Sequence, residues 1–322
     1  MLKLDLFEDI REDLNIVEKE MEKFVQTPSP LLTQTSSHLL FAGGKRLRPS
    51  FALLAGKFHN YSLEKLLPLA VALEMIHMAT LVHDDVVDAS LTRRGKPTVK
   101  AQWGDRISLH TGNYLFSKSM MLIADYADKR IPAILAKVSV QMCQGEIHQL
   151  ATAYNINQTQ RDYFYKIKRK TALLISASCQ LGAIAVEAPD NIVKSISRYG
   201  HYLGMAFQIT DDILDMTADE AELGKPIGDD IRQGIITLPV IYALQKHEHK
   251  GRLSKLLQKR DKNEREVKEI IDIIINSEGI DYSFSIARKY LEKAKKELLK
   301  LPPVECRETF RLMTDYIYTR SY

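Results

Sequence analysis

Residues 69–88 read LAVALEMIHMATLVHDDVVD, an apolar stretch that ends in three aspartates. Apolar side chains dominate as far as Val82, and Asp84, Asp85 and Asp88 then follow in the pattern Asp-Asp-x-x-Asp. A long apolar run without strict alternation is typical of a buried helix rather than of a half-exposed strand. The sequence therefore predicts a core helix that carries carboxylates at its C-terminal end.

The same acidic pattern recurs at Asp211, Asp212 and Asp215, again directly after an apolar, helix-patterned stretch. Residues four apart share one face of a helix, so Asp84 and Asp88 point the same way, as do Asp211 and Asp215. Like charges on one face repel each other, and a bound cation relieves that repulsion. Oxygen ligands without a Cys or His cluster favour a hard ion, Mg²⁺ before Ca²⁺. Either cluster alone also fits a solvated helix end, but the pair indicates a cleft with acid on both walls.

The helical period of three to four residues continues along the whole chain. It predicts an opening helix within residues 4–24 and further helices over 69–88, 107–127, 131–153, 163–185, 192–216, 238–245, 266–275 and 280–301. Strands are recognised by sustained alternation of apolar and polar residues between paired turn signals, and the sequence shows no such segment. Because no linker rich in Pro, Gly or Ser divides the 322 residues, we expect one all-α domain over residues 1–322, built around a deep central cavity.

Composition argues against several classes of protein. The formal net charge is only +4, with acids and bases interspersed, whereas a nucleic-acid partner demands a concentrated basic face. We therefore expect no nucleic-acid partner. Cys143, Cys179 and Cys306 are widely spaced and odd in number, which fits a reducing compartment and neither a disulfide framework nor a zinc site.

The N-terminus runs directly into acidic residues and lacks the basic start and apolar run of a signal peptide, which predicts a cytoplasmic protein. The most apolar segment, residues 66–82, contains Pro68 and is interrupted by Glu74 and His77. It is shorter and more polar than a spanning helix, so we expect a buried core helix and no membrane span.

Basic groups accompany the acidic ones. Residues 43–49, GGKRLRP, place three cations on a glycine-bent turn before a helix, and residues 93–97, RRGKP, begin five positions after Asp88. Further basic groups occur at residues 166–170, ending at Thr171, and in GKPIGDD at 224–230. Each basic run alone is typical of a solvated helix face. Together with the aspartates they indicate a ligand that needs both Mg²⁺ and Arg or Lys, namely a phosphate ester or diphosphate.

In this order, the motifs resemble those of the trans-prenyl diphosphate synthases over about residues 39–244. The matching motifs are GGKRLRP, HDDVVD followed by RRGKPT, KT, and QITDDILD followed by GKPIGDD and TLP. LEMIHMATLVHDDVVD and IKRKTALLI resemble more narrowly the catalytic component of the two-component hexaprenyl or heptaprenyl diphosphate synthases of Gram-positive bacteria.

This resemblance implies an isoprenoid synthase fold and head-to-tail addition of isopentenyl diphosphate to an allylic diphosphate, farnesyl diphosphate being the expected primer. It also implies an all-trans C30–C35 product for the menaquinone side chain. The two-component type acts as a heterodimer with a small non-catalytic subunit.

The resemblance also implies roles for the matched positions. Two to three Mg²⁺ ions would be held by Asp84, Asp88, Asp211 and Asp215. The allylic diphosphate would be contacted by Arg93, Lys170, Thr171, Gln208 and Lys225. Isopentenyl diphosphate would be bound by Lys45, Arg48, His77 and Arg94. The groups expected to carry catalysis are Asp84, Asp88, Asp211, Arg93 and Lys170. For His77 the alternative is a satisfied imidazole in the core.

The implied reaction begins with carbon–oxygen ionisation, after which the double bond of isopentenyl diphosphate attacks the allylic cation. Such a reaction needs no nucleophilic Ser or Cys, and the sequence shows no credible triad. Ala79 and Thr80 are small where short-chain synthases typically carry an aromatic plug, so we expect a tunnel that continues deeper, and helix facing alone does not choose between Ile76 and other bulky residues as its floor. Met75 and Phe164 are alternative floor residues.

Two positions depart from the family pattern. Ile235 stands where many relatives carry a second diphosphate-binding lysine, and Asn113 stands where an aspartate is usual. Three other interpretations remain open: a terpene cyclase-type synthase, a non-catalytic regulatory subunit on the same scaffold, and a helical interaction protein. The complete GGKRLRP, KT and twin aspartate motifs argue against all three.

Overall fold

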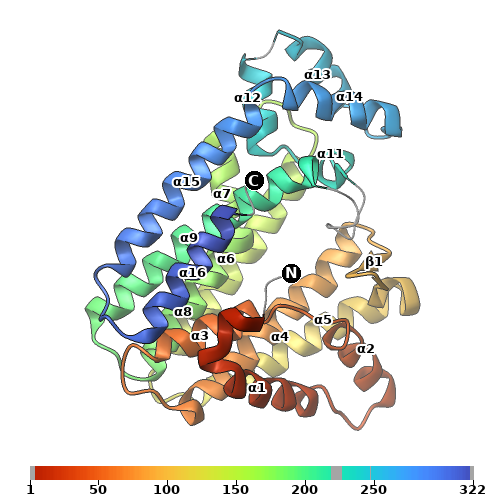
Figure 1. The fold of residues 1–322 in the computed structure, drawn as a ribbon. Helices are drawn as coiled ribbons and strands as arrows, with labels where there is room; N and C mark the ends of the chain where they lie inside the picture. The colour runs from red at the N-terminus through yellow and green to blue at the C-terminus, as the bar shows by residue number, and fades with distance from the viewer. Residues whose placement is uncertain (1–3, 219–226, 247, 320–322) are drawn as a thin grey trace. The chain divides into compact units, whose positions relative to one another are not determined.

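The computed structural model describes residues 4–218, 227–246 and 248–319 and is built from helices, as predicted (Figure 1). The elements are η1 (Leu4–Ile10), α1 (Arg11–Phe24), α2 (Pro30–Leu40), α3 (Leu47–Gly56), α4 (Leu63–Val87), β1 (Thr92–Arg93), β2 (Lys96–Pro97), α5 (Val99–Ala124), α6 (Arg130–Thr152), α7 (Gln160–Ile167), η2 (Lys168–Ala172), α8 (Leu173–Ala185), α9 (Asp190–Thr217), α11 (Asp229–Arg232), α12 (Leu238–Lys246), α13 (Lys250–Leu257), α14 (Glu264–Ile275), α15 (Gly279–Leu298) and α16 (Glu305–Thr319).

The chain forms two compact units. Unit 1 comprises the residues up to Ala136 together with Ile175–Ser197 and Leu298–Leu312. Unit 2 comprises Lys137–Leu174, Arg198–Glu297 and the chain from Met313. The first aspartate cluster belongs to unit 1 and the second to unit 2. The single domain with a central cavity stays a prediction.

Each unit has an apolar core. In unit 1, α4 and α5 lie side by side (Figure 1), and the ring of Phe310 stacks on Phe51 and Phe58 with centroids 6.2 and 5.8 Å away. In unit 2, the buried cluster includes Ile209 and Ile213 of α9. These cores position the ends of α4 and α9, where the two aspartate clusters lie.

Helix α4 is the predicted core helix, but it begins six residues earlier than expected, after the N-cap Ser62. Its 25 residues are long and apolar enough to cross a membrane by length and composition, so the expectation of a shorter, more polar segment is wrong. However, 67% of its most apolar window is buried inside the protein, which is typical of a core helix. The prediction of a buried helix is therefore confirmed.

Pro68 lies inside α4 without breaking it. One turn of the helix is bridged by a side chain: the Tyr126 hydroxyl accepts a hydrogen bond from the Leu69 amide at 3.1 Å and donates one to the Lys65 carbonyl at 2.5 Å. These two backbone groups would otherwise pair directly, so the hydroxyl is inserted into the helical ladder. Pro68 is thus accommodated while these two backbone groups keep a hydrogen-bond partner.

We expect Tyr126→Phe to lower the free energy of unfolding by about 1 kcal/mol, because it removes two hydrogen bonds of α4 and leaves the ring in place. Urea denaturation followed by circular dichroism measures the change. The matched control is Tyr114→Phe on α5, whose ring faces Lys118. Equal unfolding midpoints for the two variants would contradict the bridging role of Tyr126.

A short hairpin follows α4 and was not predicted. Strands β1 and β2 pair antiparallel, with Arg93 opposite Lys96. Arg94 and Gly95 form the turn with φ values of 54° and 74°, and positive φ at both central residues is the property of a type I′ turn. Two-residue strands are too short to show alternation. The hairpin fixes both arginines directly beyond the first aspartate cluster.

Several helices differ from the predicted pattern in their boundaries or were not predicted. The opening helix is divided into the 3₁₀ helix η1 and α1, with a non-helical residue at Phe7. The helix expected over 163–185 is α7, the π-helix η2 and α8. The prediction missed α2, α11, α13 and α16, and of α3 it gave only that a helix follows the GGKRLRP turn. Helix α3 is buried at nearly every position, so it shows no amphipathic pattern.

Candidate active site

The three cations of the GGKRLRP turn in unit 1 differ in how far they are buried. Gly43 and Arg46 have φ values of 87° and 47°, and α3 begins directly after Arg46. Arg46 is only 8% exposed and points inward, with Nε 2.5 Å from Glu18 Oε1 and Nη1 3.4 Å from Glu74 Oε1. Lys45 is exposed and Arg48 is half-buried. Arg46 therefore holds the turn through half-buried Glu18 and buried Glu74.

His77, Arg48 and Arg94 lie in one neighbourhood of unit 1. Burial and the positive charges of Arg48 and Arg94 hold the pKa of His77 well below its ordinary value. The Arg94 guanidinium also lies against the turn: a Cβ at Gly44 would be 2.9 Å from Arg94 Nη1. A neutral imidazole among guanidinium groups suits an anion. The structure thus brings together three of the four residues predicted for isopentenyl diphosphate, and exposed Lys45 adjoins Gly44 in the chain.

The first aspartate cluster divides into inward and outward side chains. Asp85 is 2% exposed, and its Oδ1 accepts hydrogen bonds from Arg93 Nε at 2.8 Å and Nη2 at 2.7 Å. Burial raises the pKa of Asp85 despite that partner. Asp84 and Asp88 are half-buried and close one turn, since the Asp88 amide donates to the Asp84 carbonyl at 2.8 Å. Arg93 is therefore positioned by the middle aspartate.

The second cluster, in unit 2, shows the same division. Asp211 is half-buried, whereas Asp212 and Asp215 are 5% and 2% exposed. Asp215 Oδ2 accepts a hydrogen bond from the Asp230 amide at 3.2 Å, which fixes the start of α11 to α9. Burial and the nearby Asp230 raise the pKa of Asp212 to about 7. Asp211 is the most accessible carboxylate of this cluster.

The Lys-Thr motif lies in the π-helix η2 of unit 2. Lys170 Nζ donates to Gln149 Oε1 at 3.3 Å, and the Thr171 hydroxyl donates to Gln208 Oε1. Helix α9 approaches η2 closely, because a Cβ at Gly204 would lie only 2.6 Å from Ala172 Cα. The wider turn of a π-helix and a glycine on the facing helix thus bring the motif to α9.

Other predicted residues lie as follows. Lys225 lies outside the described residues. Ile76 and Ala79 are buried, and Thr80 Oγ1 donates to the His77 carbonyl at 2.7 Å. Met75 is also buried, whereas Phe164 packs between the rings of Tyr163 and Tyr290 in unit 2. Ile235 is half-buried and Asn113 is exposed. The tunnel floor stays a prediction.

The carboxylates fit a magnesium site that a phosphate completes. Within residues 4–218, 227–246 and 248–319, no group of three or more His, Cys, Asp and Glu side chains is arranged around a metal position. Each cluster instead offers two carboxylates from one helix face. Mg²⁺ is usually bound by one or two carboxylates together with waters and substrate phosphates. This donor set therefore matches Mg²⁺ bound together with a diphosphate.

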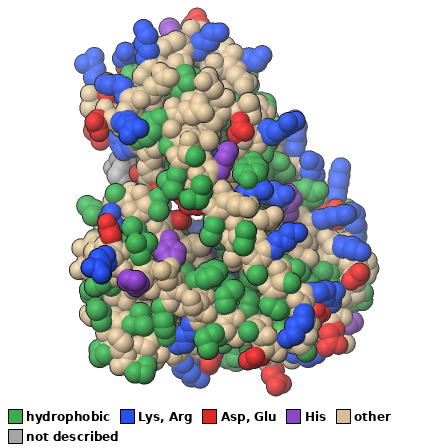
Figure 2. All heavy atoms as spheres, turned by 180° about the vertical axis from the view of Figure 1, so that it is seen from behind, with side chains coloured by type: hydrophobic (Ala, Val, Ile, Leu, Met, Phe, Trp, Pro, Cys, Tyr) green, Lys and Arg blue, Asp and Glu red, His purple; other side chains and the backbone are tan. Residues whose placement is uncertain are grey.

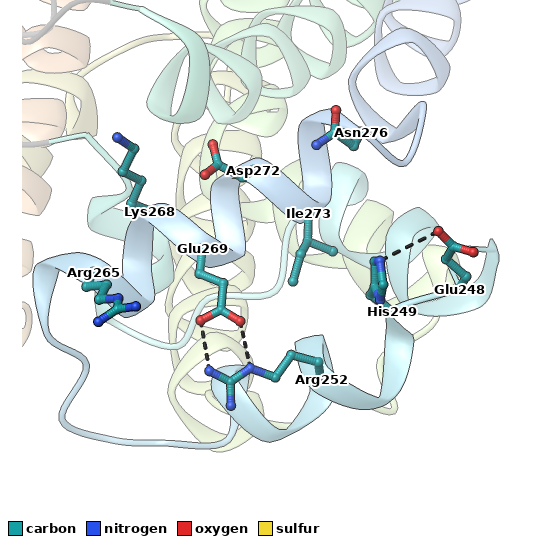
Figure 3. A pocket seen from close by; sticks show the side chains of 9 residues that line it. All are labelled: Glu248, His249, Arg252, Arg265, Lys268, Glu269, Asp272, Ile273 and Asn276. Carbon is teal, nitrogen blue, oxygen red and sulfur yellow. Dashed lines mark hydrogen bonds and ion pairs between the residues drawn. The ribbon is translucent and has the colours of Figure 1, made fainter.

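A pocket of about 740 Å³ lies elsewhere in unit 2, beside α13 and α14 (Figure 3). Glu269 pairs with Arg252 in it, and Glu248 lies 3.6 Å from His249. None of the predicted site residues lines this pocket. On the face shown in Figure 2, the described Lys and Arg side chains are interspersed with acidic and hydrophobic ones. That face has no concentrated basic surface.

Comparisons with known proteins identify the family. The pattern of the polyprenyl synthetase family matches residues 29–274. The chain is 46% identical over 317 residues to heptaprenyl diphosphate synthase component 2 of Geobacillus stearothermophilus, covering 98% of each chain. It is 44% identical over 313 residues to the protein of the same name from Bacillus subtilis, covering 97% of this chain and 89% of that protein.

Two solved structures resemble the whole chain. The heptaprenyl diphosphate synthase of Staphylococcus aureus has a TM-score of 0.92 at 37% identity, covering 97% of this chain and 99% of that one. A polyprenyl synthase of Caulobacter crescentus, complexed with calcium and isoprenyl diphosphate, has a TM-score of 0.94 at 32% identity, covering 98% and 97%. The chain therefore belongs to the polyprenyl synthetase family, and it is a prenyltransferase with the fold and long-chain product that its motifs predicted.

Proposed function

We propose that this chain is the catalytic subunit of a two-component synthase that extends farnesyl diphosphate with isopentenyl diphosphate. Its product is an all-trans C30–C35 polyprenyl diphosphate for the menaquinone side chain, made in the cytoplasm. The observation that carries this proposal is the combination of accessible aspartates at the ends of α4 and α9 with cation groups beside each cluster. The relatives named as component 2 support the two-component assignment.

The residues of unit 1 bind the acceptor substrate in this proposal. Lys45, Arg48 and Arg94 hold the diphosphate of isopentenyl diphosphate, and neutral His77 donates a hydrogen bond without adding charge. The Arg46 network keeps the turn in shape, since Glu18 and Glu74 fix the one guanidinium that points inward. Substrate binding thus uses Lys45 and Arg48 of a turn that Arg46 holds in shape.

The leaving diphosphate is the ligand that the proposal assigns to Arg93, Lys170, Thr171, Gln208 and Lys225. The same proposal assigns the metal to Asp84, Asp88, Asp211 and Asp215. Two or three bound Mg²⁺ ions supply the positive charge that stabilises the departing diphosphate. The calcium and isoprenyl diphosphate in the Caulobacter crescentus structure support this pairing of cation and ligand. The residues themselves orient the diphosphate and exclude water from the allylic cation.

The partner is a small non-catalytic subunit in this proposal. Helix α6 offers it a surface, because Val140, Ile147 and Leu150 are 58%, 66% and 48% exposed. Positions separated by seven and ten residues lie on one side of a helix, so the three form an apolar stripe. Apolar area of this kind on a soluble enzyme marks an interface. Its burial by the partner explains why two components are needed.

The test incubates the purified chain, alone and with a candidate small subunit, with farnesyl diphosphate, labelled isopentenyl diphosphate and Mg²⁺. Sizing of the labelled product is expected to show C30–C35 chains only when both components are present. Ile147→Asp should abolish long-chain synthesis even when the small subunit is present, by preventing association, while Ile16→Asp, at an exposed position of α1, serves as the control. Efficient long-chain synthesis by the chain alone would overturn the partner assignment. A product no longer than C20 with the partner would overturn the tunnel.

A further inference from the structure

Asp212, the middle aspartate of the second cluster, has both carboxylate oxygens engaged by protein groups. The Tyr163 hydroxyl donates to Oδ2 at 2.6 Å, and Gln208 Nε2 donates to Oδ1 at 2.8 Å. Gln208 in turn accepts a hydrogen bond from the Thr171 hydroxyl. A continuous chain of hydrogen bonds therefore runs from the Lys-Thr motif through α9 to Tyr163 of α7.

A buried cation, Lys166, lies beside this series of hydrogen bonds. Lys166 is 4% exposed, and its Nζ is 5.7 Å from the centre of the Tyr163 ring and donates to the Ile236 carbonyl at 3.1 Å. Its positive charge interacts favourably with Asp212 and Asp230. Tyr163 itself is fully buried. A buried carboxylate is stable only when hydrogen bonds and opposite charge compensate for its lost water, and this site provides both.

The direction of donation along this series of hydrogen bonds fixes the orientation of the Gln208 amide. A carboxylate accepting from both neighbours requires the NH₂ end of Gln208 to face Asp212. The carbonyl end then faces Thr171, and the Thr171 hydroxyl is used as its donor. The NH₂ group of Gln208 carries a second N–H besides the one that it donates to Asp212. Without Asp212, nothing in this chain of bonds would distinguish the two ends of the amide.

We propose that Asp212 and Tyr163 are positioning residues that orient Gln208 and Thr171 toward the allylic diphosphate, and that Asp212 is not a metal ligand. This inference rests on the proposed function, which assigns the diphosphate to Gln208 and Thr171. It gives the three aspartates of the cluster different tasks. Asp211 and Asp215 bind the metal, and Asp212 orients the Gln208 amide that contacts the diphosphate.

The experiment compares Tyr163→Phe and Asp212→Asn with the wild-type chain, each in the presence of the small subunit. Steady-state kinetics give KM for farnesyl diphosphate, KM for isopentenyl diphosphate, and the Mg²⁺ concentration that gives half-maximal rate. We expect KM for farnesyl diphosphate to rise about tenfold in both variants, as for loss of a hydrogen bond to a charged group. KM for isopentenyl diphosphate and the Mg²⁺ requirement at saturating farnesyl diphosphate stay unchanged.

The matched control is Tyr165→Phe, two residues along α7, where the exposed ring packs on Arg169 and His148. It should behave as wild type. A raised Mg²⁺ requirement in Asp212→Asn would overturn the inference by making Asp212 a metal ligand, as would an unchanged KM for farnesyl diphosphate in Tyr163→Phe. If Asp212→Asn does not fold, Tyr163→Phe decides alone, because it keeps the buried ring. A wild-type chain without prenyl transfer would instead refute the proposed function.

Discussion

Asp84→Ala is expected to lower kcat/KM by more than roughly a hundredfold, equivalent to at least about 3 kcal/mol of transition-state stabilisation. Asp84 is half-buried at the end of the buried core helix α4. In the proposed function, its loss removes one ligand of the metal that neutralises the leaving diphosphate. Initial rates of labelled isopentenyl diphosphate incorporation measure the effect.

The control for this variant lies within the same motif. Val87 is 43% exposed and occupies one of the two positions between the aspartates, so Val87→Ala should retain nearly the wild-type rate. Circular dichroism should show equal helix content for the two variants. Near-normal turnover by Asp84→Ala would argue directly against its metal role.

Arg46→Ala is expected to have the largest effect on stability, lowering the free energy of unfolding by about 3–5 kcal/mol. The substitution leaves Glu74, whose side chain is only 2% exposed, as a buried charge without its cation. It also removes the hydrogen bond from Arg46 Nη2 to the Leu40 carbonyl at 3.1 Å. Denaturant unfolding of the purified chain, followed by circular dichroism, measures the loss.

The neighbouring residue provides the contrast. Lys45 is exposed, so Lys45→Ala should change the free energy of unfolding by less than about 0.5 kcal/mol. Its effect should appear as a higher KM for isopentenyl diphosphate. If Arg46→Ala unfolds at the same denaturant concentration as Lys45→Ala, the inward pairing of Arg46 does not hold the turn.

The sequence predicted the parts of this protein that depend on helical period. The apolar run alone predicted helix α4 with the aspartates at its C-terminal end, and the burial of this helix is confirmed. The period also places Asp84 and Asp88 on one face. It cannot say that Asp85 turns inward to hold Arg93, because that direction depends on the hairpin that packs beside the helix end. Sequence reasoning on charge alone treats the three aspartates alike.

Two other features depend on tertiary contacts and gave no sequence signal. Lys166 belongs to a basic run that is typical of a solvated face, yet it is buried beside Tyr163, because α7 packs there against the segment before α12. The π-helix η2 interrupts an otherwise regular helical pattern, and it needs the close approach permitted by Gly204. Tyr163 and Asp212 could be found as partners only once these elements were in place.

The central claim of the proposed function is that Asp84 and Asp211 are each needed for Mg²⁺-dependent binding of the allylic diphosphate. Calorimetric titration with a non-ionisable thio analogue of farnesyl diphosphate, with and without Mg²⁺, tests it in the wild-type chain, Asp84→Ala and Asp211→Ala. We predict that binding requires Mg²⁺ and that each substitution weakens it by at least about tenfold, or roughly 1.4 kcal/mol. Mg²⁺-dependent binding of wild-type strength in either variant would contradict the account.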